Sequence, residues 1–149
     1  MREIKFRAWD KRKKYMSQVN GFSLVVHVDT GKTTKDVQLA KPFMKKDKYG
    51  GHPCYWARRD DVVLVQYVGL KDKNHKRIYE GDILGTPPDN VFGIVGFGEH
   101  NVIEDYYAYE AYGWYLEHKG KKSGILTEDL EFVEIIGNIH ENPELLENK

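Results

Sequence analysis

The chain has only one cysteine, Cys54, among its 149 residues. A single cysteine excludes an intramolecular disulfide and any metal site built from several thiolates, and it is typical of a reducing compartment. No apolar run approaches the roughly 18 residues that a membrane-spanning helix needs. The first residues alternate charged and apolar side chains, and they lack the apolar stretch and the cleavage site of a secretory signal. We therefore expect a cytoplasmic protein with no membrane partner.

Recognisable catalytic and cofactor motifs are also missing. The six histidines include no pair at i,i+2 or i,i+4, so the usual spacing of metal ligands is absent. Residues 93–98 read Gly-x-x-Gly-x-Gly, but no Lys-Ser or Lys-Thr completes a phosphate loop. His52 and Cys54 contain the groups of a Cys-His nucleophile, yet a loop cysteine beside a proline is more often a bystander. The sequence predicts a protein that is not an enzyme, with no catalytic residue, cofactor or metal.

The composition is that of a folded protein whose charge is unevenly distributed. Forty per cent of the residues are hydrophobic, and ten Tyr, six Phe and three Trp argue against wholesale disorder. Residues 1–59 carry 15 Lys and Arg against 5 Asp and Glu, a net charge of +10, whereas residues 60–149 carry 8 against 18, a net charge of −10. We expect a single domain of residues 1–149, with a subdivision into a basic N-terminal β lobe (1–60) and an acidic C-terminal lobe (61–149) as the alternative.

Three arrangements account for this division of charge. The two halves neutralise each other within one molecule, or the basic half of one subunit contacts the acidic half of the next in a head-to-tail homo-oligomer. In the third arrangement the basic half binds nucleic acid, while the acidic half limits non-specific binding. The side chains expected to contact nucleic acid are Arg7, Lys11, Arg12, Lys13, Lys14, Lys45, Lys46 and Lys48.

The pattern of apolar residues is that of short strands. Ile4, Phe6 and Ala8 alternate with charged residues, and residues 10–14 read as a charged turn, which together predict a first hairpin. The β-branched run at 22–28 should pair with a strand near 37–39, whereas residues 41–59 lack either period and read as a long excursion. Five further strands are expected, at 62–68, 76–84, 91–97, 113–117 and 132–136. These strands predict a small curled sheet or a Src-homology-3-like barrel.

Helical signals are few. Residues 104–112 combine Ala and Glu with tyrosines, and we expect a short helix or an irregular flap there. Asn142 is a good N-cap and Pro143 a good first helical residue, so residues 142–146 should form a helical turn. The predicted fold is therefore mainly β, and β-rich α+β at most.

Aromatic residues are densest between positions 106 and 115. Such side chains offer a large contact area at low entropic cost and are enriched in protein interfaces, although half of them would face a core. The negative charge of Glu104, Asp105 and Glu110 disfavours nucleic acid as their partner. The residues expected at a protein or subunit interface are Tyr106, Tyr107, Tyr109, Tyr112, Trp114 and Tyr115.

Three segments carry motifs that occur together in a known family. They are Phe-Arg-Ala-Trp-Asp at 6–10, Gly-Leu-Lys-Asp-Lys-Asn and Ile-Tyr-Glu-Gly-Asp-Ile within 69–83, and Ile-Gly-Asn-Ile with Glu-Asn-Pro-Glu-Leu-Leu within 136–146. With these motifs the chain resembles the YopX family of bacteriophage and prophage proteins. The resemblance implies a small, mainly β phage protein located in the cytoplasm of the bacterial host, and it implies no catalytic residue.

The second motif makes a specific structural prediction. Residues 62–68 and 77–84 should pair antiparallel, with 71–76 as an exposed turn and with Tyr67, Ile78 and Ile83 in the core. The resemblance leads us to expect Gly after Asn74, so His75 should lengthen the turn or carry backbone strain. If the shared motifs hold a polar site, it comprises Glu80, Asp82, Asn138 and Asn142.

These observations favour a phage or prophage accessory protein that acts by binding. The leading hypothesis is a non-enzymatic module that assembles with itself or binds a host or phage protein through its aromatic and charged surfaces. The alternative is a nucleic-acid-binding module that uses the basic N-terminal half.

Overall fold

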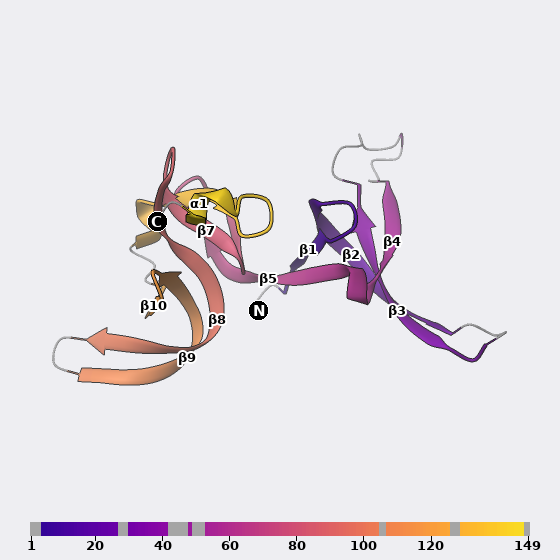
Figure 1. The fold of residues 1–149 in the computed structure, drawn as a ribbon, viewed down its shortest axis with the longest axis horizontal. Helices are drawn as coiled ribbons and strands as arrows, with labels where there is room; N and C mark the ends of the chain where they lie inside the picture. Colours follow the sequence, from indigo (N-terminus) through magenta and orange to yellow (C-terminus); the bar gives the residue numbers. More distant parts are fainter. Residues whose placement is uncertain are drawn as a thin grey trace. The chain divides into compact units, whose positions relative to one another are not determined.

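The computed structural model describes residues 4–26, 30–41, 48, 53–104, 107–125 and 129–147. The chain forms two compact units (Figure 1). Residues Lys5–Gln66 make the N-terminal unit, and the C-terminal unit begins at Tyr67 and also includes Ile4. Strand β5 (Val62–Lys71) contains the boundary, so its first part belongs to one unit and its last part to the other.

The N-terminal unit is an antiparallel sheet in the order β4-β3-β2-β1-β5. The first three strands of the chain form two consecutive hairpins, as expected from the alternation at the start of the sequence and from the β-branched run after residue 22. Its other strands are β1 (Phe6–Asp10), β2 (Tyr15–Val26), β3 (Thr33–Ala40) and β4 (Cys54–Arg58).

One face of this sheet holds the apolar core of the unit. Ala8, Val37, Leu39 and Val62 are buried there, and Ala57 of β4 joins them. Because successive side chains of a strand point to opposite faces, the residues between these core positions point to the other, outer face. In β4 the alternation is clear, since Tyr55 and Ala57 face the core while their neighbours are exposed.

The C-terminal unit contains a five-stranded sheet in the order β10-β9-β8-β7-β11, and β6 pairs with the end of β5. Two short helical segments complete it, η2 (Asp129–Glu131) and α1 (Glu144–Glu147), whereas η1 (Arg59–Asp61) precedes β5 in the other unit. The strands are β6 (Arg77–Tyr79), β7 (Asp82–Thr86), β8 (Asn90–Glu104), β9 (Tyr107–His118), β10 (Lys121–Gly124) and β11 (Glu134–Asn138).

The long strands β8 and β9 form a curved ribbon (Figure 1). They pair from Ile94 opposite Glu117 to Glu104 opposite Tyr107. Strand β10 pairs antiparallel with the end of β9. It also forms a parallel bridge from Ser123 to Asn101 of β8, so this one short strand is bonded to both strands of the curved ribbon.

The core of the C-terminal unit forms where β5, β6, β7 and β8 meet the segment after β10. Its buried members are Val68, Ile78, Leu84, Val95, Leu130 and Val133. Trp114 and Leu116 of β9 pack against this cluster, so the root of the ribbon is held by the core. Tyr67, Ile78 and Ile83 are all buried, which confirms the core positions expected from the hairpin motif.

The mainly β fold and the turn near the C-terminus are confirmed, but four expectations need correction. Residues 77–84 form two strands, because Gly81 adopts a φ of +82° and turns the chain between β6 and β7, and only β6 pairs with β5. Residues 54–58 of the expected excursion form β4. The described part of residues 104–112 is strand, since tyrosines suit an extended ribbon and cross-strand pairing outweighs the helix propensity of Ala and Glu.

The fourth correction concerns the barrel. Within the described part of the chain the strands form open sheets and no Src-homology-3-like barrel closes. Of the two architectures expected from the strand pattern, the curled sheet is the one found, because β8 and β9 are much longer than the sequence periodicity indicated and curve beyond the core.

Candidate functional site

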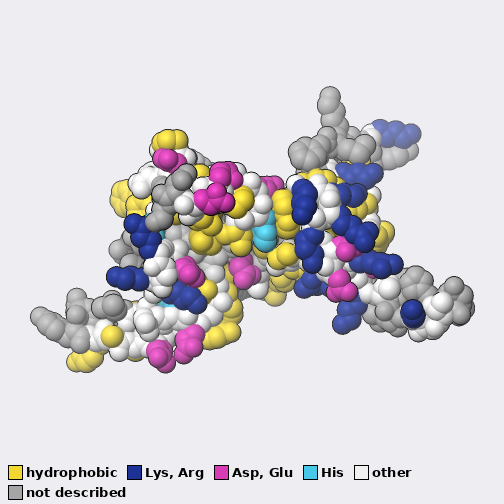
Figure 2. All heavy atoms as spheres, viewed as in Figure 1, with side chains coloured by type: hydrophobic (Ala, Val, Ile, Leu, Met, Phe, Trp, Pro, Cys, Tyr) yellow, Lys and Arg dark blue, Asp and Glu magenta, His cyan; other side chains and the backbone are white. Residues whose placement is uncertain are grey.

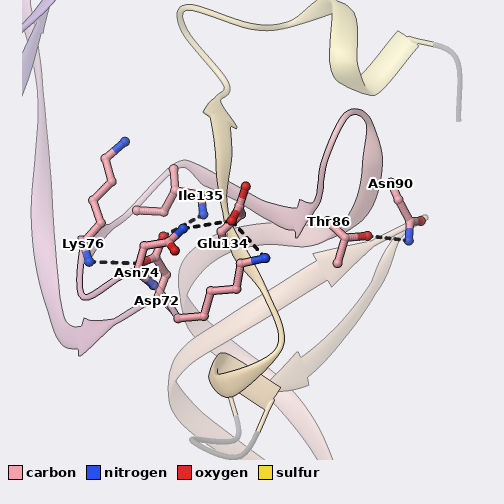
Figure 3. A network of polar contacts seen from close by, with 8 residues as sticks. Asp72, Asn74, Lys76, Thr86, Asn90, Glu134 and Ile135 are labelled. Atoms are coloured by element: carbon pink, nitrogen blue, oxygen red, sulfur yellow. Dashed lines mark hydrogen bonds and ion pairs between the residues drawn. The ribbon is translucent and has the colours of Figure 1, made fainter.

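The hairpin motif is built around a buried aspartate, Asp72 (Figure 3). Its Oδ1 accepts hydrogen bonds from the backbone N–H groups of Asn74 and Lys76, both at 2.9 Å. Its Oδ2 accepts one from the N–H of Ile135 in β11, at 3.0 Å. The same turn is tied to β11 by Glu134, which contacts the side chains of Asn74 (2.8 Å) and Lys73 (3.0 Å). Hydrogen bonds from Lys73 and Asn74 hold the pKa of Glu134 below its ordinary value.

The structure brings part of the expected polar site together, but the polar side chains there form hydrogen bonds that stabilise backbone turns. Asp82 and Asn138 are both buried and lie opposite each other in the β7–β11 pair. The Oδ2 of Asp82 accepts the N–H of Tyr79 (2.8 Å), which closes the turn at Gly81. Asn138 accepts the N–H groups of His140 (3.0 Å) and Glu141 (2.9 Å). These contacts give both side chains a structural role.

Asn142 and Glu80 are the other two residues of the expected polar site. The Oδ1 of Asn142 accepts the N–H of Asn138 at 3.3 Å, and its backbone carbonyl accepts the N–H of Leu145 at 3.2 Å as α1 begins. Glu80 is half-buried in the turn between β6 and β7. Burial lowers the pKa of the neighbouring His140 despite the opposing charge of Glu141.

The basic turn, which we define as Lys11–Arg12–Lys13–Lys14 between β1 and β2, is exposed. Figure 2 shows dark blue side chains gathered over the N-terminal unit. Asp10 fixes the backbone of this turn, because its Oδ1 accepts the N–H groups of Arg12 (2.9 Å) and Lys13 (2.8 Å). Two of the basic side chains have partners within the unit. The Nε of Arg12 lies 3.2 Å from Asp61, and the Nζ of Lys13 lies 3.5 Å from the centre of the Tyr55 ring.

Asp10 and Tyr55 form a short hydrogen bond beneath this turn. The Tyr55 hydroxyl donates to Oδ2 of Asp10 at 2.6 Å. Burial alone would raise the pKa of Asp10, but the hydrogen bonds from Tyr55, Lys13 and Arg12 outweigh it and lower the pKa below 3.8. Burial and the hydrogen bond to Asp10 raise the pKa of Tyr55 above its ordinary value. The pair therefore stays as carboxylate and phenol over a wide pH range.

Among the other residues expected to contact nucleic acid, Arg7 lies on β1 and points to the outer face, and Lys48 is exposed in a turn. Lys45 and Lys46 lie outside the described residues.

The expected interface residues lie on the β8–β9 ribbon, and the ribbon divides them between two faces. Tyr112 and Trp114 alternate with Tyr107, Tyr109 and Tyr115, so the two groups point in opposite directions. Tyr106 lies outside the described residues. The ring of Tyr115 covers Gly96, where a Cβ atom would come within 2.5 Å of that ring, so a larger residue at this position would have to displace the ring.

One of these faces is both aromatic and acidic. Phe97 lies with its ring centre 5.3 Å from that of Tyr112 and 4.8 Å from that of Trp114. Tyr112 is 76% exposed and Phe97 48% exposed, so the apolar surface continues outward beyond the core. Glu99 lies opposite Tyr112, and Glu110 follows on the same side. We call Phe97, Glu99, Glu110 and Tyr112 the ribbon face.

A cleft of about 860 Å³ lies between the ribbon and β10, and sequence reasoning missed it. His100 is buried at its wall, with Nδ1 3.2 Å from the Gly98 carbonyl oxygen. Lys122 extends over the Tyr115 ring at 4.6 Å. The cleft is formed by the parallel bridge between β10 and β8, which no local pattern signals. Its lining mixes both charges, including Glu99, Glu110, Lys121 and Lys122.

Within the described residues no three His, Cys, Asp or Glu side chains are grouped as a metal site would require. In the same part of the chain no helix combines the length and the apolar character needed to cross a membrane.

Fold and site together define a mainly β protein whose motif residues stabilise turns and whose exposed features are a basic turn and an aromatic, acidic ribbon. The chain belongs to the YopX family, because the model of that family, described as YopX protein, matches residues 5–147. The chain is similar to protein EF1440 from Enterococcus faecalis, known from a crystal structure, with 25% sequence identity, a TM-score of 0.49, and coverage of 99% of this chain and 100% of that one. No curated protein matches the chain.

Proposed function

We propose that this protein acts by binding and that its ribbon face contacts the basic N-terminal unit of a second copy. The protein is then a phage or prophage accessory module that assembles head to tail. The proposal is based on the observation that the two structural units have opposite net charges. Residues 5–66 carry 14 Lys and Arg against 6 Asp and Glu (+8), and residues 67–149 carry 8 against 16 (−8).

The chemistry of the ribbon face suits such a contact. Exposed aromatic rings bury a large area at low entropic cost, and they attract cations through their faces. Tyr112 lies beside Glu99 and Glu110, so a lysine or arginine that reaches Tyr112 also meets a carboxylate. The face projects on a regular two-stranded ribbon whose root is anchored by Trp114 and Leu116, so its geometry is set before binding.

The basic turn supplies a matching surface. Asp10 holds its backbone in one conformation, and Lys11 and Lys14 are exposed while Arg12 and Lys13 are engaged within the unit. A contact between the turn of one copy and the ribbon face of the next is heterologous, and it leaves a free turn and a free ribbon at the ends. Assembly should therefore grow with concentration instead of stopping at a dimer unless the ring closes.

Light scattering after size exclusion tests this proposal. We expect a mass that rises with protein concentration at about 0.1 M salt and falls toward the monomer at about 1 M, where the Debye length shrinks from about 10 Å to about 3 Å. The triple variant Glu99→Lys, Glu110→Lys, Tyr112→Ala should be monomeric at all salt concentrations. A monomeric wild type at every protein and salt concentration would overturn self-assembly.

A matched control uses residues of the same unit away from the ribbon face. Glu131 ends η2, Phe132 follows it, and both are exposed, so Glu131→Lys with Phe132→Ala makes the same change in charge, and a comparable change in apolar surface, as the double ribbon variant Glu99→Lys with Tyr112→Ala, which should lose assembly. The control variant should assemble like the wild type. Equal loss of assembly in the control would mean that net charge, and not the ribbon face, governs association.

A further inference from the structure

The cleft between the ribbon and β10 has a histidine built into its wall. The ring of His100 lies on two glycines, since a Cβ atom at Gly113 would lie 3.8 Å from its Cε1 and one at Gly124 would lie 3.5 Å from its Nε2. The carbonyl oxygen of Gly98 can only accept a hydrogen bond, so Nδ1 of His100, 3.2 Å away, carries a proton. The neutral ring therefore has its lone pair on Nε2, beside Gly124 in the lining of the cleft.

Cations gather at the same cleft, although residues 67–149 carry a net charge of −8. Three of the eight Lys and Arg residues in that part of the chain are Lys119, Lys121 and Lys122, in or next to β10. Lys119 (φ +49°) and Gly120 (φ +77°) form the two-residue turn from β9 to β10, and two left-handed residues are typical of a turn whose twist matches that of the strands. This turn places Lys121 and Lys122 in the lining of the cleft.

Tyr115 connects the second of these lysines with the histidine. Its ring centre lies 4.6 Å from Nζ of Lys122 and 5.9 Å from the centre of the His100 ring. Tyr115 stands opposite Gly124 of β10 and Gly96 of β8. Lys122 is two residues before Gly124, and on β8 His100 is four residues after Gly96. Side chains at even spacing point to the same side of a strand, so the ammonium group and the imidazole share the side of the Tyr115 ring.

We propose that this cleft binds a small phosphate monoester, such as a phosphorylated sugar. A phosphate monoester carries close to two negative charges at neutral pH and has three acceptor oxygens. It can therefore use the ammonium groups of Lys121 and Lys122 together with the hydroxyl of Ser123, whereas a carboxylate offers only two oxygens. Nε2 of His100 accepts a proton from the phosphate or from a hydroxyl group of the ligand. The cleft of about 860 Å³ lies within the roughly 300–1,000 Å³ of small-molecule sites.

The carboxylates of the cleft favour a ligand that is small and that also donates hydrogen bonds. Glu99 and Glu110 line the cleft together with the two lysines of β10. Among the described residues no ion pair joins these carboxylates to those lysines, so both kinds of charge remain available to a ligand. A polyanion would meet both carboxylates and the negative charge of the whole unit, and repulsion disfavours it. The hydroxyl groups of a sugar can instead donate to the carboxylates while its one phosphate contacts the lysines.

Binding of a phosphate monoester goes beyond self-assembly and does not depend on it. Glu99 and Glu110 belong both to the cleft and to the ribbon face, so a variant at either position would confuse the two functions. The variants that test the cleft are therefore placed at His100 and on β10, and all residues of the ribbon face stay unchanged.

Isothermal titration calorimetry with ribose 5-phosphate, inorganic phosphate and ribose tests the proposal. We expect ribose 5-phosphate to bind with a Kd below about 1 mM, inorganic phosphate to bind at least about tenfold more weakly, and ribose not to bind measurably. Lys121→Ala with Lys122→Ala removes the charge-assisted hydrogen bonds to the phosphate and should raise the Kd at least about tenfold. His100→Asn keeps a donor nitrogen for the Gly98 carbonyl but removes Nε2, and it should raise the Kd about fivefold.

Lys71→Ala with Lys76→Ala is the matched control, because it removes the same charge from two exposed positions outside the cleft. It should bind like the wild type. Circular dichroism melts establish that each variant is folded. No binding of ribose 5-phosphate to the wild type, wild-type affinity in both folded cleft variants, or an equal loss in the control would overturn the proposal. Equal affinities for inorganic phosphate and ribose 5-phosphate would overturn the assignment of an organic phosphate and the role given to the two carboxylates.

Discussion

The Oδ2 of Asp72 accepts a hydrogen bond from the backbone N–H of Ile135 at 3.0 Å, across 63 residues of sequence. The other carboxylate oxygen accepts two N–H groups of the hairpin turn that follows Asp72. One buried side chain therefore defines the turn between β5 and β6 and attaches it to β11. These contacts give the aspartate of the most recognisable motif a structural role.

Replacing Asp72 should destabilise the C-terminal unit strongly. Asp72→Ala removes all three hydrogen bonds to a buried carboxylate and leaves the N–H of Ile135 without its acceptor, so the free energy of unfolding should fall by about 3 kcal/mol. Urea unfolding measures it. Lys73→Ala is the control, because it removes only a surface ion pair to Glu134 and should cost no more than about 1 kcal/mol. Equal effects of the two substitutions would contradict the role given to Asp72.

Ile83→Ala removes a side chain that is fully buried in β7. The lost apolar contacts and the cavity that remains should lower the free energy of unfolding by about 2–5 kcal/mol. Thermal melts of this variant and of Ile4→Ala, whose side chain is 69% exposed, provide the comparison. An unchanged midpoint for Ile83→Ala would show that β7 is not part of a packed core.

His75→Gly should be neutral or stabilising. His75 has a φ of +62°, as expected for a turn in which glycine is usual, and its side chain is exposed. Glycine relieves the left-handed strain and costs chain entropy in the unfolded state, so the net gain should lie between zero and about 1 kcal/mol. Chemical denaturation measures the change. A clear loss of stability would mean that the His75 side chain makes a contact that matters.

The Asp10–Tyr55 hydrogen bond should be visible in pH titrations. Because the pKa of Asp10 is lowered in the folded state, its contribution to stability is present above the ordinary value of 3.8 and is lost as pH falls through the folded pKa. In Tyr55→Phe the carboxylate loses its shortest hydrogen bond, so the pKa of Asp10 should rise. Carboxyl carbon NMR follows this titration directly.

The pH dependence of stability that comes from Tyr55 has the opposite sign and lies at alkaline pH. Its pKa is raised from 10.0 in the folded state, so stability should decline as pH rises above about 10, where only the unfolded chain releases this proton. Tyr55→Phe should weaken that decline, whereas Tyr107→Phe, at a tyrosine that is 76% exposed, serves as the comparison. Identical alkaline profiles for wild type and Tyr55→Phe would contradict the assignment.

Local patterns predicted the parts of the fold that local chemistry decides. The alternation at Phe6 and Ala8 gave β1, the turn around Asp72 gave the β5–β6 hairpin, and Asn142 with Pro143 gave the last helical turn. The local patterns failed where pairing with a strand distant in the sequence determines the structure. The strand at 107–118 depends on its partner β8, and the sheet position of β7 depends on β11, some fifty residues away in the sequence.

For the candidate sites too, local patterns in the sequence indicate some features, whereas others depend on long-range pairing. Glu110 and Tyr112 of the ribbon face belong to the aromatic and acidic cluster that the sequence shows, whereas Phe97 and Glu99 join them only through the pairing of β8 with β9. The cleft at His100 depends on a bridge between Ser123 and Asn101 that has no sequence signature. The side chains of Asp82 and Asn138, two members of the expected polar site, accept hydrogen bonds from the backbone of the turns that they stabilise.

Complementation between two charge-reversed variants tests head-to-tail assembly most directly. One variant carries Glu99→Lys and Glu110→Lys on the ribbon face, and the other carries Lys11→Glu and Lys14→Glu on the basic turn. Each should be monomeric alone by light scattering at about 0.1 M salt, because like charges meet at the contact. Mixed in equal amounts they should associate, since an intact ribbon face in one meets an intact turn in the other, and the reversed pair also attracts. A mixture that stays monomeric while the wild type assembles would contradict the account.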